Sequence, residues 1–218
     1  MKPILAAFAA AALLATAPHA QTIPEPVGAP PAGTYKLDRA HASLNFRVSH
    51  MGFSHWTARF TTFDATLTGD PANPAASSVT ATVDAHSLQT NYPFSDFNFD
   101  EQLTGKEWLD AAQYPQMTFR STKVEVTGPK TAKVTGDFTL HGITKPVTLD
   151  VTYNGGYGRQ AYDPGGSRIG FSAHGWLKRS DYGISMGIPA PGSIMGVGDD
   201  VEIIIEAEFT RPLDKAGS

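Results

Sequence analysis

The chain of 218 residues contains no cysteine. This absence excludes a disulfide-stabilised scaffold, cysteine-ligated zinc or iron–sulfur sites, a catalytic thiol, and attachment to a membrane through a lipidated N-terminal cysteine. Positive charge is also scarce, because 17 Lys and Arg face 21 Asp and Glu and the formal net charge is −4. A general nucleic-acid binder needs a basic surface to replace the counterions of the phosphates, so no nucleic-acid partner is expected.

Familiar catalytic motifs are lacking as well. There is no Gly-x-Ser-x-Gly elbow and no His-Glu-x-x-His pair, and the Gly-x-Gly sequences at 156–158 and 196–198 lack the third glycine of a dinucleotide fingerprint. An EF-hand-like series from Asp96 to Glu107 has Glu101 where the loop requires glycine, so its acids are interpreted as helix caps and solvated side chains. We therefore expect no catalytic centre, no metal and no cofactor.

The longest apolar run, from Ile4 to Ala17, follows Lys2 and ends in small residues before Ala20. This pattern predicts a secretory signal peptide over residues 1–20 and a periplasmic location for the mature chain. The run is shorter than the roughly 20 residues that cross a bilayer, so no stable membrane insertion is expected after cleavage. An uncleaved membrane anchor is the less favoured alternative.

The rest of the chain divides into three parts. Residues 21–33 contain four of the sixteen prolines and no periodic apolar pattern, which predicts an extended linker. A single domain is predicted over residues 34–211, followed by a short tail at 212–218. A domain of this size can bury a core without disulfides or metal.

Alternation of apolar and polar residues predicts β-strands in most of this domain. The alternating segments are residues 43–50, 79–85, 134–140, 147–153, 169–177 and 201–209. A further segment, 117–126, changes phase and predicts a bulge near Ser121. Turn-forming residues such as Asp70–Pro74, His141-Gly142 and Asn154–Gly156 separate the segments. We predict an all-β fold, an antiparallel barrel of about eight strands, because closure removes exposed strand edges.

The segment between His86 and Pro115 lacks this alternation. It is rich in aromatic residues, and short helical turns are expected around residues 100–103 and 106–112. A connection of this length in a compact domain is usually functional, which favours a short helical lid at one end of the barrel. The lid residues expected to contact a ligand are Phe94, Phe97, Phe99, Leu103 and Trp108.

A barrel of this size either fills with side chains or holds one small ligand. Small inward-facing residues favour a cavity, and they are Ala81, Ala85, Gly136, Ala173, Gly175 and Ala207. The expected wall is formed by Phe46, Val48, His50, Phe60, Phe138, Leu140 and Phe171. His50 is interpreted first as a hydrogen-bonded core histidine, with a polar ligand contact as the alternative. Basic residues are interpreted as solvated or paired, with an Arg or Lys at the rim binding an anionic head group as the alternative.

The order of several segments resembles the YceI family of bacterial polyisoprenoid-binding proteins. The matching segments are Tyr35–Asp38, Phe46–Gly52, Phe60–Phe63, Glu107–Asp110, Thr118–Thr122, Gly136–Val147 and Arg179–Gly183. The resemblance implies a lipocalin-like barrel in the periplasm, without a catalytic centre, whose apolar tunnel holds an isoprenoid such as a quinone tail or polyprenyl phosphate, or another long-chain lipid. This chain departs from the family pattern at Phe94–Phe99 and at Met186–Val197.

Two other functions stay open at this point. One is an enzyme that acts on an isoprenoid or lipid head group through His50 and the acids of the lid. The other is a ligand-free, stress-related interaction module whose partner binds the loop Met186–Val197. The sequence also leaves a homodimer open.

Overall fold

The computed structural model describes residues 23–212. The predicted signal peptide and all but the first residue of the predicted tail lie outside the described residues. In the described part of the predicted linker, Val27 pairs with Arg159 as an isolated bridge. Within residues 23–212, no helix has the length and apolar character that a membrane crossing requires.

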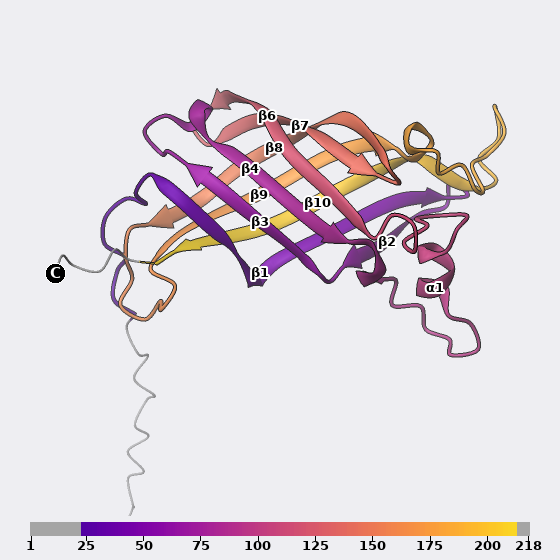
Figure 1. Cartoon of the computed structure of the whole chain (residues 1–218), viewed down its shortest axis with the longest axis horizontal. Helices are drawn as coiled ribbons and strands as arrows, with labels where there is room; N and C mark the ends of the chain where they lie inside the picture. The colour runs from indigo at the N-terminus through magenta and orange to yellow at the C-terminus, as the bar shows by residue number, and fades with distance from the viewer. Residues whose placement is uncertain (1–22, 213–218) are drawn as a thin grey trace, which may run out of the picture.

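Antiparallel strands form almost the whole domain (Figure 1). They are β1 (Gly33–His50), β2 (Ser54–Phe60), β3 (Phe63–Gly69), β4 (Ser78–Asp84), β5 (Leu88–Gln89), β6 (Gln116–Gly128), β7 (Thr131–Leu140), β8 (Ile143–Tyr157), β9 (Ser167–Lys178) and β10 (Val197–Arg211). The barrel runs in the order β10-β9-β8-β7-β6-β4-β3-β1, and β1 pairs with β10 to close it. The predicted barrel of eight antiparallel strands is confirmed.

Helices are few and short in the described chain. They are α1 (Phe99–Thr104) and the 3-10 turns η1 (Pro74–Ala76), η2 (Ala85–Ser87) and η3 (Arg179–Tyr182). Figure 1 shows α1 and the loop after η3 at one end of the barrel, which we call the lid end. The β3–β4 and β6–β7 turns lie at the opposite end, which we call the far end.

A bulge allows β1 to pair with two neighbouring strands, β2 and β3, along the same edge. Its first four residues pair with β3, whereas residues 44–50 pair with β2, and both parts pair with β10. Residues 38–41 form the bulge, with Glu208 of β10 as the single residue opposite them. The bulge bends the strand, so the wall divides and β2 and β5 extend toward the lid.

Two other strand irregularities lie where the sequence predicted a bulge and a turn. A register shift between Ser121 and Lys123 in β6 confirms the predicted bulge. The predicted turn at Asn154–Gly156 is wrong, because these residues continue β8 and form a bulge between Tyr153 and Gly155. Gly155 has a φ of 148° and lies opposite Gly170, so the glycines accommodate an unusual backbone inside a strand rather than ending it.

The buried core lies inside the barrel in three groups. The lid-end group contains Val83, Ala85, Ala111, Met117, Leu140, Tyr182 and Ile184. The far-end group contains Tyr35, Leu37, Leu67, Ile169, Ala207 and Phe209. A smaller group beneath the lid contains Ala58, Leu88 and Leu103. These groups bury apolar faces of strands from all around the barrel, but they do not fill its interior.

Candidate functional site

An apolar cavity of about 820 Å³ occupies the interior of the barrel. At the lid end it reaches His50, Ser54 and Tyr92, and at the far end it reaches the turns at residues 69–78 and 128–131. Exposed residues line it at both ends, so it opens to solvent at both. Its volume falls in the range of about 300–1,000 Å³ that is typical of small-molecule sites.

Most of the residues that the sequence proposed for the ligand site line this cavity. The ten that do are Phe46, Val48, His50, Phe60, Phe99, Leu103, Trp108, Phe138, Leu140 and Phe171. Phe94 and Phe97 do not belong to the wall, because their side chains are turned to solvent and are 63% and 46% exposed. The structure thus brings the strand residues and the inner lid residues together and leaves the lid tip outside.

Rings form a continuous path from the cavity wall to the lid tip. Phe46 contacts Trp56 with centroids 6.2 Å apart, and Trp56 contacts Phe99 at 5.4 Å. Phe99 contacts Tyr92 at 5.3 Å, and Tyr92 also packs edge-on against Phe94 at 5.4 Å. Packed rings therefore join the cavity wall to the exposed lid tip through Tyr92 and Phe99.

Local polar contacts fix the lid segment. The Asn98 side chain caps α1 by accepting a hydrogen bond from the backbone N–H of Glu101, and Asp100 accepts bonds from both the backbone N–H and the hydroxyl of Thr90. The first predicted helical turn is thus confirmed. The second, at 106–112, is wrong: this stretch consists of hydrogen-bonded turns, and Asp110 has a φ of 43°, which interrupts a helix.

The small inward-facing residues behave in two ways. Ala81, Ala173 and Ala207 line the cavity as expected. At Gly136, however, an added Cβ would lie 2.4 Å from the Phe119 ring, and at Gly175 it would lie within 2.6 Å of Leu149. These two glycines make room for neighbouring side chains, so the expectation that they leave room for a ligand is wrong.

Sequence reasoning missed several wall residues. Trp56 and Phe63 line the cavity from β2 and β3, two strands without an assigned pattern in the sequence reading. The alternation of Trp56, Ala58 and Phe60 is a signal that could have revealed β2. Arg179 also belongs to the wall, and no periodicity predicts a cation there.

Arg179 is 5% exposed and makes four hydrogen bonds to backbone carbonyls. Nε donates to Gly198 at 2.8 Å, Nη1 to Ile184 at 3.2 Å and Met186 at 2.8 Å, and Nη2 to Val197 at 2.8 Å. These bonds hold the loop that the sequence singled out at Met186–Val197. Burial lowers the pKa of Arg179 from its ordinary value, yet an arginine stays charged in a protein.

His50 lies at the edge of the lid-end opening. It pairs across the sheet with Ser54 of β2 and with Val197 of β10, and it is exposed rather than a core histidine. No ion pair joins His50 to an acid within residues 23–212. Of the lid acids, Asp100 is bonded to Thr90, so the arrangement does not present an acid–base pair with His50.

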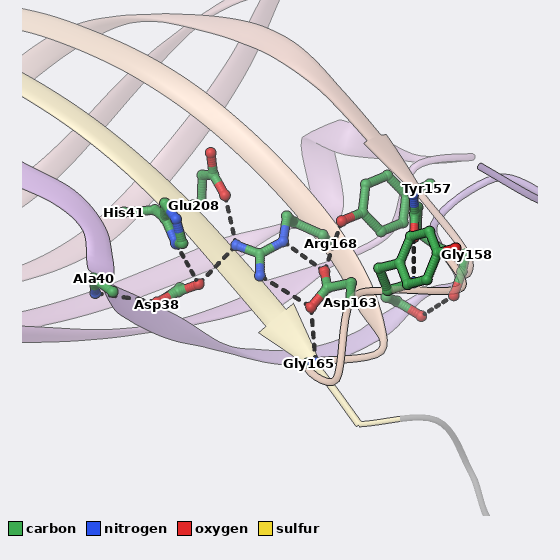
Figure 2. Close-up of polar contacts among 12 residues, drawn as sticks. Asp38, Ala40, His41, Tyr157, Gly158, Asp163, Gly165, Arg168 and Glu208 are labelled. Carbon is green, nitrogen blue, oxygen red and sulfur yellow. Dashed lines mark hydrogen bonds and ion pairs between the residues drawn. The ribbon is translucent and has the colours of Figure 1, made fainter. Parts of the chain in front are cut away.

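A polar cluster outside the cavity provides a second candidate (Figure 2). Asp38, His41 and Glu208 bring potential metal-ligand atoms within 4.8 Å of one another, the one such group found among the described residues. Arg168 already lies between the acids, because its Nη1 donates to Asp38 at 2.7 Å and to Glu208 at 2.5 Å. The acids therefore neutralise an internal cation, and the cluster belongs to the closure of the barrel.

A closed antiparallel barrel around an apolar cavity is an architecture that can hold one small hydrophobic molecule. The YceI-like domain matches residues 35–209, and the chain belongs to the YceI family. It is 38% identical over 211 residues to Protein YceI of Salmonella arizonae, covering 95% of this chain and 97% of that protein.

Solved structures show the same architecture. BcnA of Burkholderia cenocepacia is similar with a TM-score of 0.65 and 27% identity, over 79% of this chain and 98% of that one. A polyisoprenoid binding domain from Saccharophagus degradans superposes with a TM-score of 0.54 over 82% of this chain and 98% of its own. At 16% identity, this second likeness concerns the fold alone.

Proposed function

We propose that the protein is a non-catalytic periplasmic binding or carrier protein that holds an isoprenoid chain, or a similar long amphiphile, inside the barrel. The observation that carries the proposal is the apolar cavity of about 820 Å³, which extends from the lid to the far-end turns. Membership of the YceI family supports a binding role. The predicted signal peptide at residues 1–20 supports the periplasmic location.

The cavity volume limits the size of the ligand. One water molecule takes about 30 Å³ of liquid volume, so about 820 Å³ holds roughly 27 non-hydrogen atoms at liquid density. An isoprene unit contributes five carbons, and about five units fill the cavity at this density. A longer chain would emerge through the far-end opening between the β3–β4 and β6–β7 turns.

Burial of such a chain needs few polar contacts. Each methylene removed from water contributes about 0.8 kcal/mol, and association costs roughly 4–15 kcal/mol in lost freedom. A chain of about five isoprene units exceeds that cost through apolar contact alone. The nearly continuous apolar wall therefore suits a lipid tail better than a compact polar substrate.

Native occupancy tests the proposal. Protein purified from its own periplasm is extracted and analysed by mass spectrometry, beside two tryptophan variants on β9. Ala173→Trp fills the cavity and should reduce the extracted lipid strongly, whereas Ser172→Trp should retain it, because Ser172 faces outward and bonds to Glu206. Absence of any co-purifying lipid, together with no binding of added isoprenoids, would overturn the proposal.

A further inference from the structure

Exposed apolar side chains gather at the lid end of the barrel. Three connections meet there, at residues 50–55, 90–98 and 183–197, and we call them the lid-end loops. They carry seven of the thirteen large apolar side chains that are exposed within residues 23–212, namely Phe53, Tyr92, Phe94, Phe97, Met186, Ile194 and Met195. A concentration of exposed apolar surface marks a contact with a protein or a membrane.

The lid-end loops are almost free of charge. Asp96 is the one Asp, Glu, Lys or Arg in their thirty residues, although 17% of the whole chain is charged. Charged groups are costly in the apolar part of a bilayer, whereas aromatic residues favour its interface with water. The composition of the loops therefore suits contact with lipid. Without Lys or Arg, the loops have no basic group that would attract anionic lipids.

Hydrogen bonds within the protein hold the third of these loops in place. Arg179 donates to three carbonyl groups of residues 183–197. The backbone N–H of Met51 donates to the carbonyl of Gly196 at 2.8 Å, which fastens the loop to the β1–β2 turn. Backbone groups that are bonded within the protein lose less when they leave water. The buried arginine thus gives this uncharged loop a fixed shape whose bonded carbonyls can approach lipid.

The lid-end loops border the opening of the cavity. Tyr92 lines the cavity, and its ring packs edge-on against the exposed ring of Phe94. At the β1–β2 turn, His50 and Ser54 line the cavity on either side of the segment that carries Phe53. An apolar molecule at this opening can therefore pass between the loop surface and the cavity wall without crossing a charged surface.

We propose that the lid-end loops dock the protein reversibly on the surface of a lipid bilayer, and that the ligand passes between the bilayer and the cavity through the lid-end opening. This inference rests on the proposed function for the nature of the ligand and adds a partner and a route. Peripheral elements of this kind bury apolar side chains about 5–10 Å into the boundary between head groups and acyl chains.

A lipid surface fits these loops better than a second copy of the chain. A stable protein interface buries about 800 Å² on each partner with close complementarity. The exposed side chains here lie on separate strand connections around an opening (Figure 1) and do not form one flat face. A fluid bilayer adapts to separate loop tips, whereas a rigid copy of the same loops does not.

Vesicle binding tests the docking surface. Protein purified from its own periplasm is mixed with phosphatidylcholine vesicles, and the bound fraction is measured by flotation. Phe53→Ser and Phe94→Ser should each weaken binding by about tenfold, because each removes an apolar side chain that lipid would bury. Tyr162→Ser is the matched control, because Tyr162 is 65% exposed, compared with 77% for Phe53, but lies in the β8–β9 loop at the far end. Binding should be equal at low and high salt, since salt screens only charges.

The outcomes separate docking from the proposed function. Absence of wild-type flotation, or equal losses in Phe94→Ser and Tyr162→Ser, would overturn the inference, and retained binding of geranylgeraniol would then leave the proposed function intact. Flotation without any binding of geranylgeraniol would contradict the proposed function and the route with it. Binding that disappears at high salt would overturn apolar docking. A dimer in sedimentation velocity that Phe94→Ser dissociates, without vesicle binding, would assign the loops to a second copy.

Tryptophan reporters locate the contact while a large apolar side chain is kept at each position. Phe94→Trp and Tyr162→Trp place an added ring at the two ends of the barrel, over the same background of Trp56, Trp108 and Trp176. Vesicles of brominated phosphatidylcholine should quench Phe94→Trp more strongly, because bromine on the acyl chains quenches only rings that reach them. Equal quenching, or stronger quenching of Tyr162→Trp, would place the contact away from the lid end and overturn the proposal.

Discussion

Replacing Arg168 with methionine is expected to lower the free energy of unfolding by about 3 kcal/mol at neutral pH. Nε and Nη2 both donate to Asp163, at 2.7 and 3.2 Å, and that carboxylate is 9% exposed. Such a two-bond pair contributes about 2 kcal/mol, and the bond to the less buried Asp38 about 1 kcal/mol. Glu208 is 40% exposed and adds little because water screens it.

The loss should depend on pH. A hydrogen bond from Arg168 holds the pKa of Asp163 well below its usual range. Burial opposes the same change at Asp38, but bonds from Arg168, His41 and Ala40 still lower its pKa. Depressed folded-state pKa values stabilise the protein above the unfolded value of about 3.9, and this stabilisation disappears as the pH falls through the folded values. In the variant, protonation instead relieves repulsion among the acids, so the difference from wild type shrinks below about pH 4.

Urea unfolding followed by circular dichroism, at neutral pH and at about pH 3, measures both effects. Lys133→Met is the matched control, because Lys133 pairs with Asp150 on the surface with 51% and 72% of the two side chains exposed. The control should change stability by less than about 0.5 kcal/mol. An Arg168 variant no less stable than the Lys133 variant, or a difference from wild type that is the same at both pH values, would refute the reasoning.

Two further predictions concern the lid and the barrel wall. Phe99→Ala should weaken binding of geranylgeraniol by about tenfold in a fluorescence titration, whereas Phe94→Ala should leave it unchanged, because only Phe99 of the two lines the cavity; equal effects would contradict this geometry. Gly136→Ala should lower stability by about 2 kcal/mol in thermal unfolding, because the new methyl group would lie 2.4 Å from Phe119. A neutral result there would show that the Phe119 ring moves aside freely.

Strand content could be predicted from the sequence because alternation directly reports which face of a strand is buried. The phase change near Ser121 revealed even a bulge, since an inserted residue must exchange the two faces. The same logic failed at Asn154–Gly156, where glycine signals a special backbone but does not specify whether it ends or bends a strand. Composition cannot separate these outcomes, because the pairing partner Gly170 comes from another strand.

The candidate site was predictable in its apolar wall but not in its buried arginine. Phe46 and Phe171 follow the strand pattern, so their inward direction is encoded locally. Arg179 reaches the wall because the chain turns after β9 and the carbonyls of a loop up to 19 residues away surround its guanidinium. Such a long-range arrangement leaves no periodic signal, and the sequence could offer only the general alternative of a cation at the rim.

Closure of the barrel explains where the two arginines, Arg168 and Arg179, lie. β1 must bend to pair with both β2 and β3, and the bend inserts residues 38–41 into the seam with β10. This bulge brings Asp38 beside Glu208, and two neighbouring carboxylates would repel each other unless a cation lay between them. Arg168 supplies that cation within the fold, whereas Arg179 at the other end donates its hydrogen bonds to backbone carbonyls and has Asp199 as its neighbouring acid. One arginine thus neutralises the acids that the bent strand brings together at the seam, and the other fixes the loop beside the cavity through backbone carbonyls.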